Sequence, residues 1–268
     1  MEKITSKQNP RIKNLIRLHS SRGRQKQNRI AVFGSREIFR ALSCGVVAEE
    51  LFICEEHLDP QAVAQLKQQV ADFSVAWSID NVLFEKVCFG NRKDGLIMTA
   101  SRPIQSIDNV FAAVPSSPLI AVVESIEKPG NLGAILRSAD GAGIDAVIAA
   151  DPLTDWFHPN TIRSSLGTCF SIPGCVASSS DVQQRLLSEG YQVVVANLEG
   201  AKQFHSLDLT GKTAIVLGNE ANGVSDAWRL KEFHAAKLPM MGIADSLNVS
   251  ATAAAMFYEA RRQRDRLV

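Results

Sequence analysis

The chain has 268 residues, 46% of them hydrophobic and 21% charged, enough for two ordinary domains with buried cores. No stretch approaches the roughly 18 uninterrupted apolar residues of a membrane span, and the N-terminus lacks the apolar core of a secretion signal, so we expect a cytoplasmic protein. The five cysteines form no C-x-x-C pair, so we expect neither a disulfide framework nor a metal site.

The net charge of +1 hides an asymmetry along the chain. Residues 1–40 carry eleven Lys or Arg against two Glu, a net charge of +9, so the remaining residues sum to −8. Clustered cations gain affinity for phosphates by releasing counterions, so this segment is either a solvated basic face or an RNA-contacting patch. The candidate RNA-binding residues are Arg11, Lys13, Arg22, Arg24, Lys26 and Arg36.

Before residue 101 the pattern predicts a small α/β/α sandwich. Helices are predicted over Pro10–His19, Arg36–Ser43 and Pro60–Val70. Strands are predicted over Ile30–Phe33, Glu50–Cys54, Ser74–Trp77 and Gly95–Ala100. Three prolines and several small polar residues in Ser101–Pro118 mark a break. We therefore predict a domain over 1–105, a linker over 106–118 and a second domain over 119–268.

After the break, Leu119–Glu124 is a continuous apolar run, typical of a strand that helices cover on both faces. Further strands are predicted at Ala146–Ala150, Val193–Ala196, Ala214–Leu217 and Ala236–Pro239. Helices are predicted at Asn131–Ala142 and near 160–167, 181–188, 226–232 and 249–264. This alternation predicts a parallel sheet wound with helices.

Several common catalytic motifs are absent from the sequence. It has no G-x-x-x-x-G-K-[ST] phosphate loop, no G-x-G-x-x-G opening a helix, no H-E-x-x-H and no G-x-S-x-G. These absences argue against an ATPase, a dehydrogenase, a zinc protease and a serine hydrolase. The first strand of the second domain leads into Glu124-Ser125-Ile126 instead of a glycine fingerprint, which also weakens a Rossmann-type methyltransferase.

Three segments that follow predicted strands carry polar side chains at the edge where open α/β sheets bind ligands. The first, residues 128–140, is a helix whose Arg137 lies opposite the apolar stripe, either as an ordinary solvated arginine or as a ligand contact. Leu132, Ile135, Leu136 and Ala139 form that stripe at helical spacing.

The second segment, Ile215–Ser225, runs from an apolar strand into a loop with two glycines and the carboxylate of Glu220. It is either a tight turn or a ligand-binding loop. The third, Leu238–Ser250, places Ser246, Asn248 and Ser250 before an Ala-rich helix, where they either cap the helix or hold a polar ligand.

Together these segments closely resemble the three motifs of the TrmH/SpoU family of RNA ribose methyltransferases, within the SPOUT superfamily. N-x-x-A-x-x-R matches Asn131, Ala134 and Arg137; G-x-E-x-x-G matches Gly218, Glu220 and Gly223; P-M followed by S-L-N-V-S matches Pro239, Met240 and Ser246–Ser250. Order and spacing agree over residues 119–264.

The N-terminal stretches NPRIKNLIRLHSSRGR and VFGSREIFRAL are similar to the substrate-binding domain of many family members, which is related to RNA-binding ribosomal proteins. Where relatives often show Phe-x-x-Glu-Gly, this chain has Phe33-Gly34-Ser35-Arg36-Glu37.

The resemblance implies a C-terminal trefoil knot that binds S-adenosylmethionine and a homodimer that completes the site. It implies that the adenosine lies against Gly218, Leu238 and Leu247, with Leu217, Ile243 and Asn197 close by. The catalytic set that it implies is Arg137, Asn131, Glu220, Ser246 and Asn248. In this set Glu220 braces its loop, and Arg137 lies near the target ribose with Asn131 beside it.

A ribose hydroxyl is a weak nucleophile, so methyl transfer needs it held in line with the sulfonium methyl while its proton is withdrawn. An arginine is almost always protonated, so we interpret Arg137 as an orienting and charge-stabilising group more than as a general base.

The sequence thus predicts an S-adenosylmethionine-dependent methyltransferase acting on a ribose 2′-hydroxyl of RNA. Ribosomal RNA is favoured because the N-terminal domain resembles that of rRNA-directed members. Two alternatives stay open: a tRNA 2′-O-methyltransferase, and a non-catalytic RNA-binding or ribosome-assembly protein that keeps the knot. The intact motif residues Asn131, Arg137 and Glu220, with Ser246–Ser250, argue against the second alternative.

Overall fold

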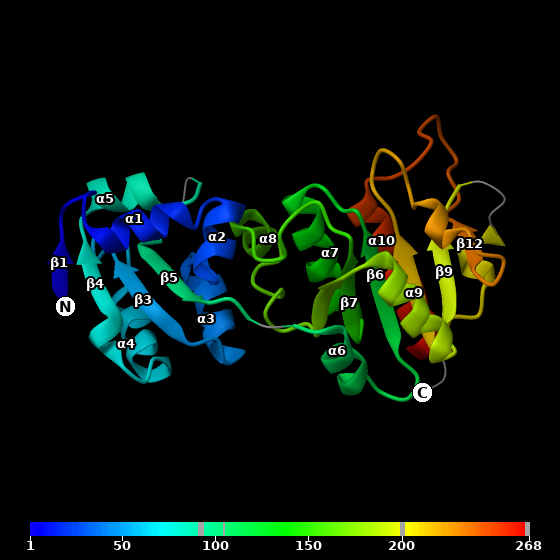
Figure 1. Cartoon of the computed structure of the whole chain (residues 1–268), viewed down its shortest axis with the longest axis horizontal. Coiled ribbons are helices and arrows are strands. Elements are labelled where there is room, and N and C mark those ends of the chain that lie inside the picture. The colour runs from blue at the N-terminus through cyan, green and yellow to red at the C-terminus, as the bar shows by residue number, and fades with distance from the viewer. Residues whose placement is uncertain (91–93, 104, 199–201, 266–268) are drawn as a thin grey trace. The chain divides into compact units, whose positions relative to one another are not determined.

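A computed structural model describes residues 1–90, 94–103, 105–198 and 202–265 (Figure 1). The chain forms two compact units. The first comprises Met1–Ile104 and Phe157–Ser171, and the second comprises Gln105–Trp156 and Ile172–Val268. The segment 157–171 therefore packs with the N-terminal part of the chain, although it follows the second unit's first strands in sequence.

The first unit is a five-stranded mixed sheet of order β1-β4-β3-β5-β2. Its strands are β1 (Glu2–Ile4), β2 (Arg29–Phe33), β3 (Ala48–Ile53), β4 (Ala76–Ile79) and β5 (Leu96–Ser101). Its helices are α1 (Pro10–Arg17), α2 (Ser21–Gln27), α3 (Ser35–Ser43), α4 (Pro60–Gln69), α5 (Asn81–Val87) and α8 (Pro159–Ser164). Helix α1 packs with α5, and α3 packs with α4 on the other side of the sheet (Figure 1). The predicted α/β/α sandwich is therefore confirmed.

Local sequence explains why α2 was not predicted. Its sequence SRGRQKQ has no apolar stripe, and its buried residue is Arg24. The helix forms because Ser20 caps its start by accepting from the Gly23 amide, and because Asn28 ends it in the left-handed region at φ 48°. A Cβ at Gly23 would lie 1.8 Å from the carbonyl oxygen of Arg17, so only glycine permits this close approach to the end of α1.

Strand β4 begins two residues later than the predicted Ser74–Trp77. Asp72 accepts from the Ser74 amide at 2.9 Å and starts a short 3-10 turn over Phe73–Val75. The capped turn delays the extended conformation until Ala76, because the side-chain hydrogen bond competes with the strand ladder.

The second unit is a seven-stranded sheet of order β10-β12-β9-β11-β6-β7-β8, in which every described pairing is parallel. Its strands are β6 (Leu119–Glu124), β7 (Ala146–Ala150), β8 (Gly174–Ala177), β9 (Gln192–Ala196), β10 (Lys202–Gln203), β11 (Thr213–Leu217) and β12 (His234–Lys237). The predicted parallel α/β fold class is therefore confirmed, while the trefoil knot stays a prediction.

Helices cover both faces of this sheet. Val110 and Phe111 of α6 (Ile107–Ala113) and Val182 and Leu186 of α9 (Ser179–Ser188) join alternate strand residues in one apolar cluster. Helices α7 (Pro129–Ala142) and α10 (Val249–Asp265) pack against each other and against the other face. Helix α6 lies inside the range 106–118 predicted as the linker. The predicted helix near 226–232 is a single 3-10 turn, Asp226–Trp228.

No helix among the described residues is long and apolar enough to cross a membrane. In the same described ranges, no group of three or more His, Cys, Asp or Glu side chains is placed to hold a metal ion. The cysteines are free thiols. Burial raises the pKa of Cys169 to about 12 and that of Cys175 to about 11, so both thiols stay protonated at neutral pH.

Candidate cofactor-binding and active site

A cavity of about 390 Å³ lies in the second unit at the carboxyl ends of β9, β11 and β12. Three stretches of chain line most of it: the loop after β11, the stretch after β12, and the residues that lead into α10. This is the edge of the sheet where open parallel α/β domains bind their ligands. The cavity therefore joins the second and third motif segments at one place.

Most of the predicted cofactor contacts line this cavity. They are Asn197, Leu217, Gly218, Leu238 and Leu247. The sixth, Ile243, does not line it; its side chain is fully exposed on the loop that precedes α10. The structure thus brings five of the six predicted contacts together.

The loop after β11 is folded upon itself. The amides of Asn219 and Gly223 each donate to the other's carbonyl at 2.9 Å, and the Asn219 side chain accepts from the amides of Ala221 and Asn222. A Cβ at Gly218 would lie 2.2 Å from the carbonyl carbon of Gly223, and Gly223 has φ +66°. Both glycines are therefore required by the turn itself, which also forms one wall of the cavity.

Four of the five predicted catalytic residues lie close together. Glu220 and Ser246 line the cavity. The Asn131 amide, in the first turn of α7, donates to Glu220 and accepts from Asn248 Nδ2 at 3.4 Å. The Asn248 side chain also accepts from the Ser250 amide at 2.9 Å and so caps α10. Asn131 thereby links all three motif segments. Asn248 both caps α10 and contacts Asn131 in the site.

Arg137 lies apart from this group. It is exposed on α7 and has no hydrogen-bond or ion-pair partner among the described residues. The predicted stripe on the other face of α7 is fully buried: Leu132, Ile135, Leu136 and Ala139. An unpaired, solvated guanidinium is free to bind an incoming phosphate or ribose oxygen.

The cavity also has lining residues that the sequence analysis did not single out. Val249, Thr252 and Met256 lie on one face of α10, and Arg229 and Lys237 add two cations. The i, i+3, i+7 spacing of the α10 residues is a signal that identifies a common face. No sequence signal distinguishes Arg229 from other surface arginines.

In the first unit, the predicted RNA-binding cations differ in exposure and pairing. Arg24 is fully buried, and its guanidinium donates to the Leu18 and His19 carbonyls at 2.9 and 3.0 Å. These hydrogen bonds satisfy carbonyls at the C-terminal end of α1. We therefore correct the role of Arg24 from an RNA contact to a structural one. Arg36 is ion-paired with Glu37 at 2.8 Å. Lys13, Arg22 and Lys26 are exposed and have no ion-pair partner among the described residues.

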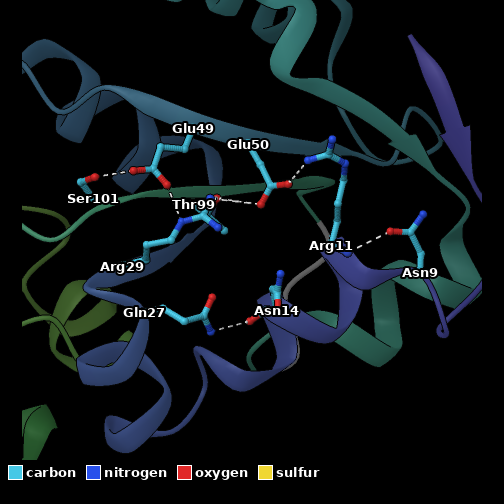
Figure 2. A network of polar contacts seen from close by, with 9 residues as sticks. All are labelled: Asn9, Arg11, Asn14, Gln27, Arg29, Glu49, Glu50, Thr99 and Ser101. Atoms are coloured by element: carbon cyan, nitrogen blue, oxygen red, sulfur yellow. Dashed lines mark hydrogen bonds and ion pairs between the residues drawn. The ribbon is translucent and has the colours of Figure 1, made fainter.

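Arg11 belongs to a polar network that spans three strands of the first unit. Figure 2 shows Arg11 of α1 and Arg29 of β2 reaching Glu50 of β3, at 2.6 and 3.1 Å. Arg29 also donates to Thr99 at 2.8 Å and pairs with Glu49. Part of the positive charge of residues 1–40 is therefore neutralised within the fold.

The fold and the cavity define an α/β enzyme domain with a ligand site at the carboxyl edge of its sheet. The sequence profile of the SpoU rRNA Methylase family matches residues 118–258, and that of the MRM3-like substrate binding domain matches residues 9–97. The chain belongs to the SpoU rRNA methylase family.

Relatives match over nearly the whole length. The 23S rRNA guanosine 2′-O-methyltransferase RlmP of Bacillus subtilis (strain 168) is 26% identical over 261 residues, covering 97% of this chain and 100% of the relative.

A solved RNA 2′-O ribose methyltransferase is 36% identical with a TM-score of 0.85, covering 99% of this chain and all of that one. AviRb of Streptomyces viridochromogenes, a SpoU methyltransferase solved with AdoMet, is 27% identical with a TM-score of 0.85, over 96% and 100% of the two chains. The predicted resemblance and enzyme class are confirmed.

Proposed function

We propose that this protein transfers the methyl group of S-adenosylmethionine to a ribose 2′-hydroxyl of ribosomal RNA. The observation that carries the proposal is the convergence of the motif segments: Glu220 and Ser246 line the cavity, and Asn131 at the start of α7 is hydrogen-bonded to Glu220 and Asn248. The rRNA substrate is supported by RlmP, which matches this chain over both of its domains and is named for 23S rRNA.

The cavity suits this cofactor in size and chemistry. Its volume of about 390 Å³ lies within the usual range of small-molecule sites. Leu217, Leu238 and Leu247 offer an apolar wall for an adenine ring, and Asn197 offers an amide for a ribose hydroxyl. The carboxylate of Glu220 is suited to a cationic ligand. S-adenosylmethionine supplies a methyl group activated by a positively charged sulfur.

Residues of the motif segments orient the acceptor, some at the cavity and Arg137 outside its lining. The unpaired guanidinium of Arg137 binds the target ribose and its phosphate and stabilises the negative charge that builds on the 2′-oxygen. Asn131 is held from both sides, by Glu220 and Asn248, so its position is fixed before substrate arrives. Ser246 adds a hydroxyl at the cavity wall. Fixed dipoles of this kind act without reorganisation during the reaction.

We assign RNA docking to the domain over 1–105 and catalysis to the domain over 119–268, to whose apolar core helix α6 of the range 106–118 also contributes. Lys13, Arg22 and Lys26 are the strongest candidates for phosphate contacts, because their charges are exposed and unpaired among the described residues. Arg11 and Arg36 retain exposed guanidinium groups beside their carboxylate partners. Because the proposed substrate is ribosomal RNA, the location that we propose is the cytoplasm.

We also propose a homodimer whose protomers each contain the knot. The loop before α10 exposes large apolar side chains, Met241 at 95% and Ile243 at 105%, and Tyr258 of α10 is 54% exposed. Side chains of this kind gain stability when a second copy covers them. Ile243 would then approach a cofactor site only in the dimer.

The test is to map 2′-O-methyl groups in rRNA and tRNA from cells with and without the gene. We expect one rRNA position to lose its methyl group and to regain it with the wild-type gene, but not with an Arg137→Ala gene. Loss of a tRNA methyl group instead would favour the tRNA alternative. Tight S-adenosylmethionine binding with no RNA position changed would favour the non-catalytic alternative.

A further inference from the structure

Glu124, the last residue of β6, is a buried carboxylate that the mechanism above does not use. It is 3% exposed. Its Oε1 accepts from the hydroxyls of Ser225 at 2.7 Å and Ser179 at 3.0 Å, and its Oε2 accepts from the Ser225 amide at 2.7 Å. Burying a carboxylate is costly unless hydrogen bonds compensate it, and these three donors both compensate its burial and fix its position.

Ser225 ends the loop that follows β11, and the residue after Glu124, Ser125, binds the beginning of that loop. Ser125 is in the left-handed region at φ 49°, which turns its carbonyl toward the loop after β11. That carbonyl accepts from Asn219 Nδ2 at 3.0 Å, while the Ser125 amide donates to the Ala150 carbonyl of β7 at 2.9 Å. Two consecutive residues at the end of β6 therefore bind both Asn219 and Ser225.

The loop between these two anchors is a wall of the cavity. Residues 217–224 all line it, whereas Glu124 and Ser125 do not. The hydrogen bonds between Asn219 and Gly223 fix the loop's shape but not its place over the sheet. Its place is set at one end by the strand β11 and at the other by Ser225, whose hydrogen bonds to β6 among the described residues are those to the Glu124 carboxylate.

We propose that Glu124 is a positioning residue for cofactor binding, acting through Ser225 to hold the loop 218–225 against the sheet. The inference rests on the proposed function, since it takes S-adenosylmethionine as the ligand of the cavity. It assigns to Glu124 no contact with the cofactor or the RNA. Substituting Glu124 should therefore change the affinity for the cofactor and not the rate of the methyl-transfer step.

The experiment compares Glu124→Gln with wild type in the full-length chain. The amide has the shape of the carboxylate but only one acceptor oxygen, so its NH2 group cannot accept from the donors that one carboxylate oxygen now binds, and the remaining hydrogen bonds become neutral. We expect the Kd of S-adenosylmethionine and of S-adenosylhomocysteine, measured by calorimetry, to rise about tenfold, as does the KM for the cofactor. We expect kcat at saturating cofactor and the KM for RNA to stay within about twofold, because Glu124 is assigned no contact with the RNA or with the methyl group that is transferred.

Asp145→Asn is the matched control. The Asp145 carboxylate accepts from the Leu119 amide at 2.7 Å, at the opposite end of the same strand β6. It too supports the sheet through a backbone hydrogen bond, but it lies away from the loop. We expect Asp145→Asn to lower the Tm without changing the Kd of the cofactor.

Ser225→Ala provides a second route if Glu124→Gln fails to fold. It removes one donor to Glu124 and keeps the backbone donor, and we expect a Kd increase of about three- to fivefold. In the double variant, the two effects should combine to less than their product, because both act through one contact. Amide hydrogen exchange without cofactor should quicken at Gly223 in Glu124→Gln and not in Asp145→Asn.

Wild-type cofactor affinity in a folded Glu124→Gln protein, or an equal loss in Asp145→Asn, would overturn the role of Glu124. Wild-type protein that binds no S-adenosylmethionine would instead overturn the proposed function. In that case the exchange rate at Gly223 still decides whether Glu124 holds the loop.

Discussion

Substitution of Arg137 should affect methyl transfer without affecting the stability of the fold. The residue lies opposite the buried stripe of α7, so Arg137→Ala opens no core cavity, and we expect its stability to change by about 0.5 kcal/mol or less. Methyl transfer should fall by about 100-fold or more, because the lost interaction is stronger in the transition state than in the ground state. Single-turnover methylation of rRNA measures this, and calorimetry should show a nearly unchanged Kd for S-adenosylmethionine.

Two further variants sharpen the result for Arg137. Arg137→Lys should recover only part of the activity, since a point charge lacks the planar fork that grips two oxygens. Arg262→Ala removes another exposed arginine, one paired with Glu259 on α10, and should leave turnover unchanged. A folded Arg137→Ala protein within a few-fold of wild type would make Arg137 an ordinary solvated arginine.

Single residues also show how far the sequence predicts the site. Asn197, Leu217 and Gly218 were assigned to the cofactor through the motif resemblance, and the structure places them at one cavity. A count of charges treats every cation alike. It could not distinguish the buried Arg24, whose guanidinium donates to the carbonyl of Leu18 at the end of α1, from the exposed Lys13. Glu124 stands in an apolar run, and nothing in that run indicates a carboxylate held by two serines.

At the scale of elements, periodic apolar runs were predicted well and short or polar elements were not. The strand β6 has the bounds predicted from LIAVVE, because a strand buried on both faces is apolar throughout. Strand β8 is only four residues long, and α2 has no apolar stripe, so neither carries a periodic signal. Helix α6 falls in a segment whose prolines indicated a break.

Arg264 joins the C-terminal helix α10 to the segments that precede the strands β6 and β11. Its guanidinium donates to the carbonyls of Ser117, Leu209 and Gly211 at 2.9, 3.0 and 2.5 Å, and burial lowers its pKa from the usual arginine value. We expect Arg264→Ala to lower the free energy of unfolding by about 2 kcal/mol, since several carbonyls, two of them on exposed residues, lose one shared charged donor. Urea unfolding measures this. Arg262→Ala, which removes an exposed ion pair, should lower the free energy of unfolding much less, and an equal loss in both variants would contradict the role of Arg264.

For the whole molecule, the assignment of RNA binding to one domain and catalysis to the other can be tested by removing positive charges from the first domain. We expect the triple variant Lys13→Ala, Arg22→Ala, Lys26→Ala to weaken rRNA binding and to reduce the slope of log Kd against log salt by about 2 to 3, since each phosphate contact contributes about 0.9. The Kd for S-adenosylmethionine should not change. Filter binding at several salt concentrations measures the slope.

Truncation is a poorer test of the same division. The segment Phe157–Ser171 packs in the first unit, so a chain that starts near Ser106 would leave its buried Ile162 and Cys169 without their surroundings. Unchanged RNA affinity and salt slope in the full-length triple variant would contradict the assignment of docking to the N-terminal domain.

The assembly is predicted from the apolar surface around the third motif. Met241, Ile243 and Tyr258 are exposed in one chain, and a two-fold contact would bury the same side chains on both protomers. We expect light scattering at micromolar concentration to give about twice the chain mass of 29.2 kDa. Met241→Asp with Ile243→Asp should shift the mass toward one chain, because burying two carboxylates costs more than the contact gains. Activity should fall with dimer content. A wild-type mass of one chain, or an unchanged mass in the double variant, would contradict a dimer formed through this loop.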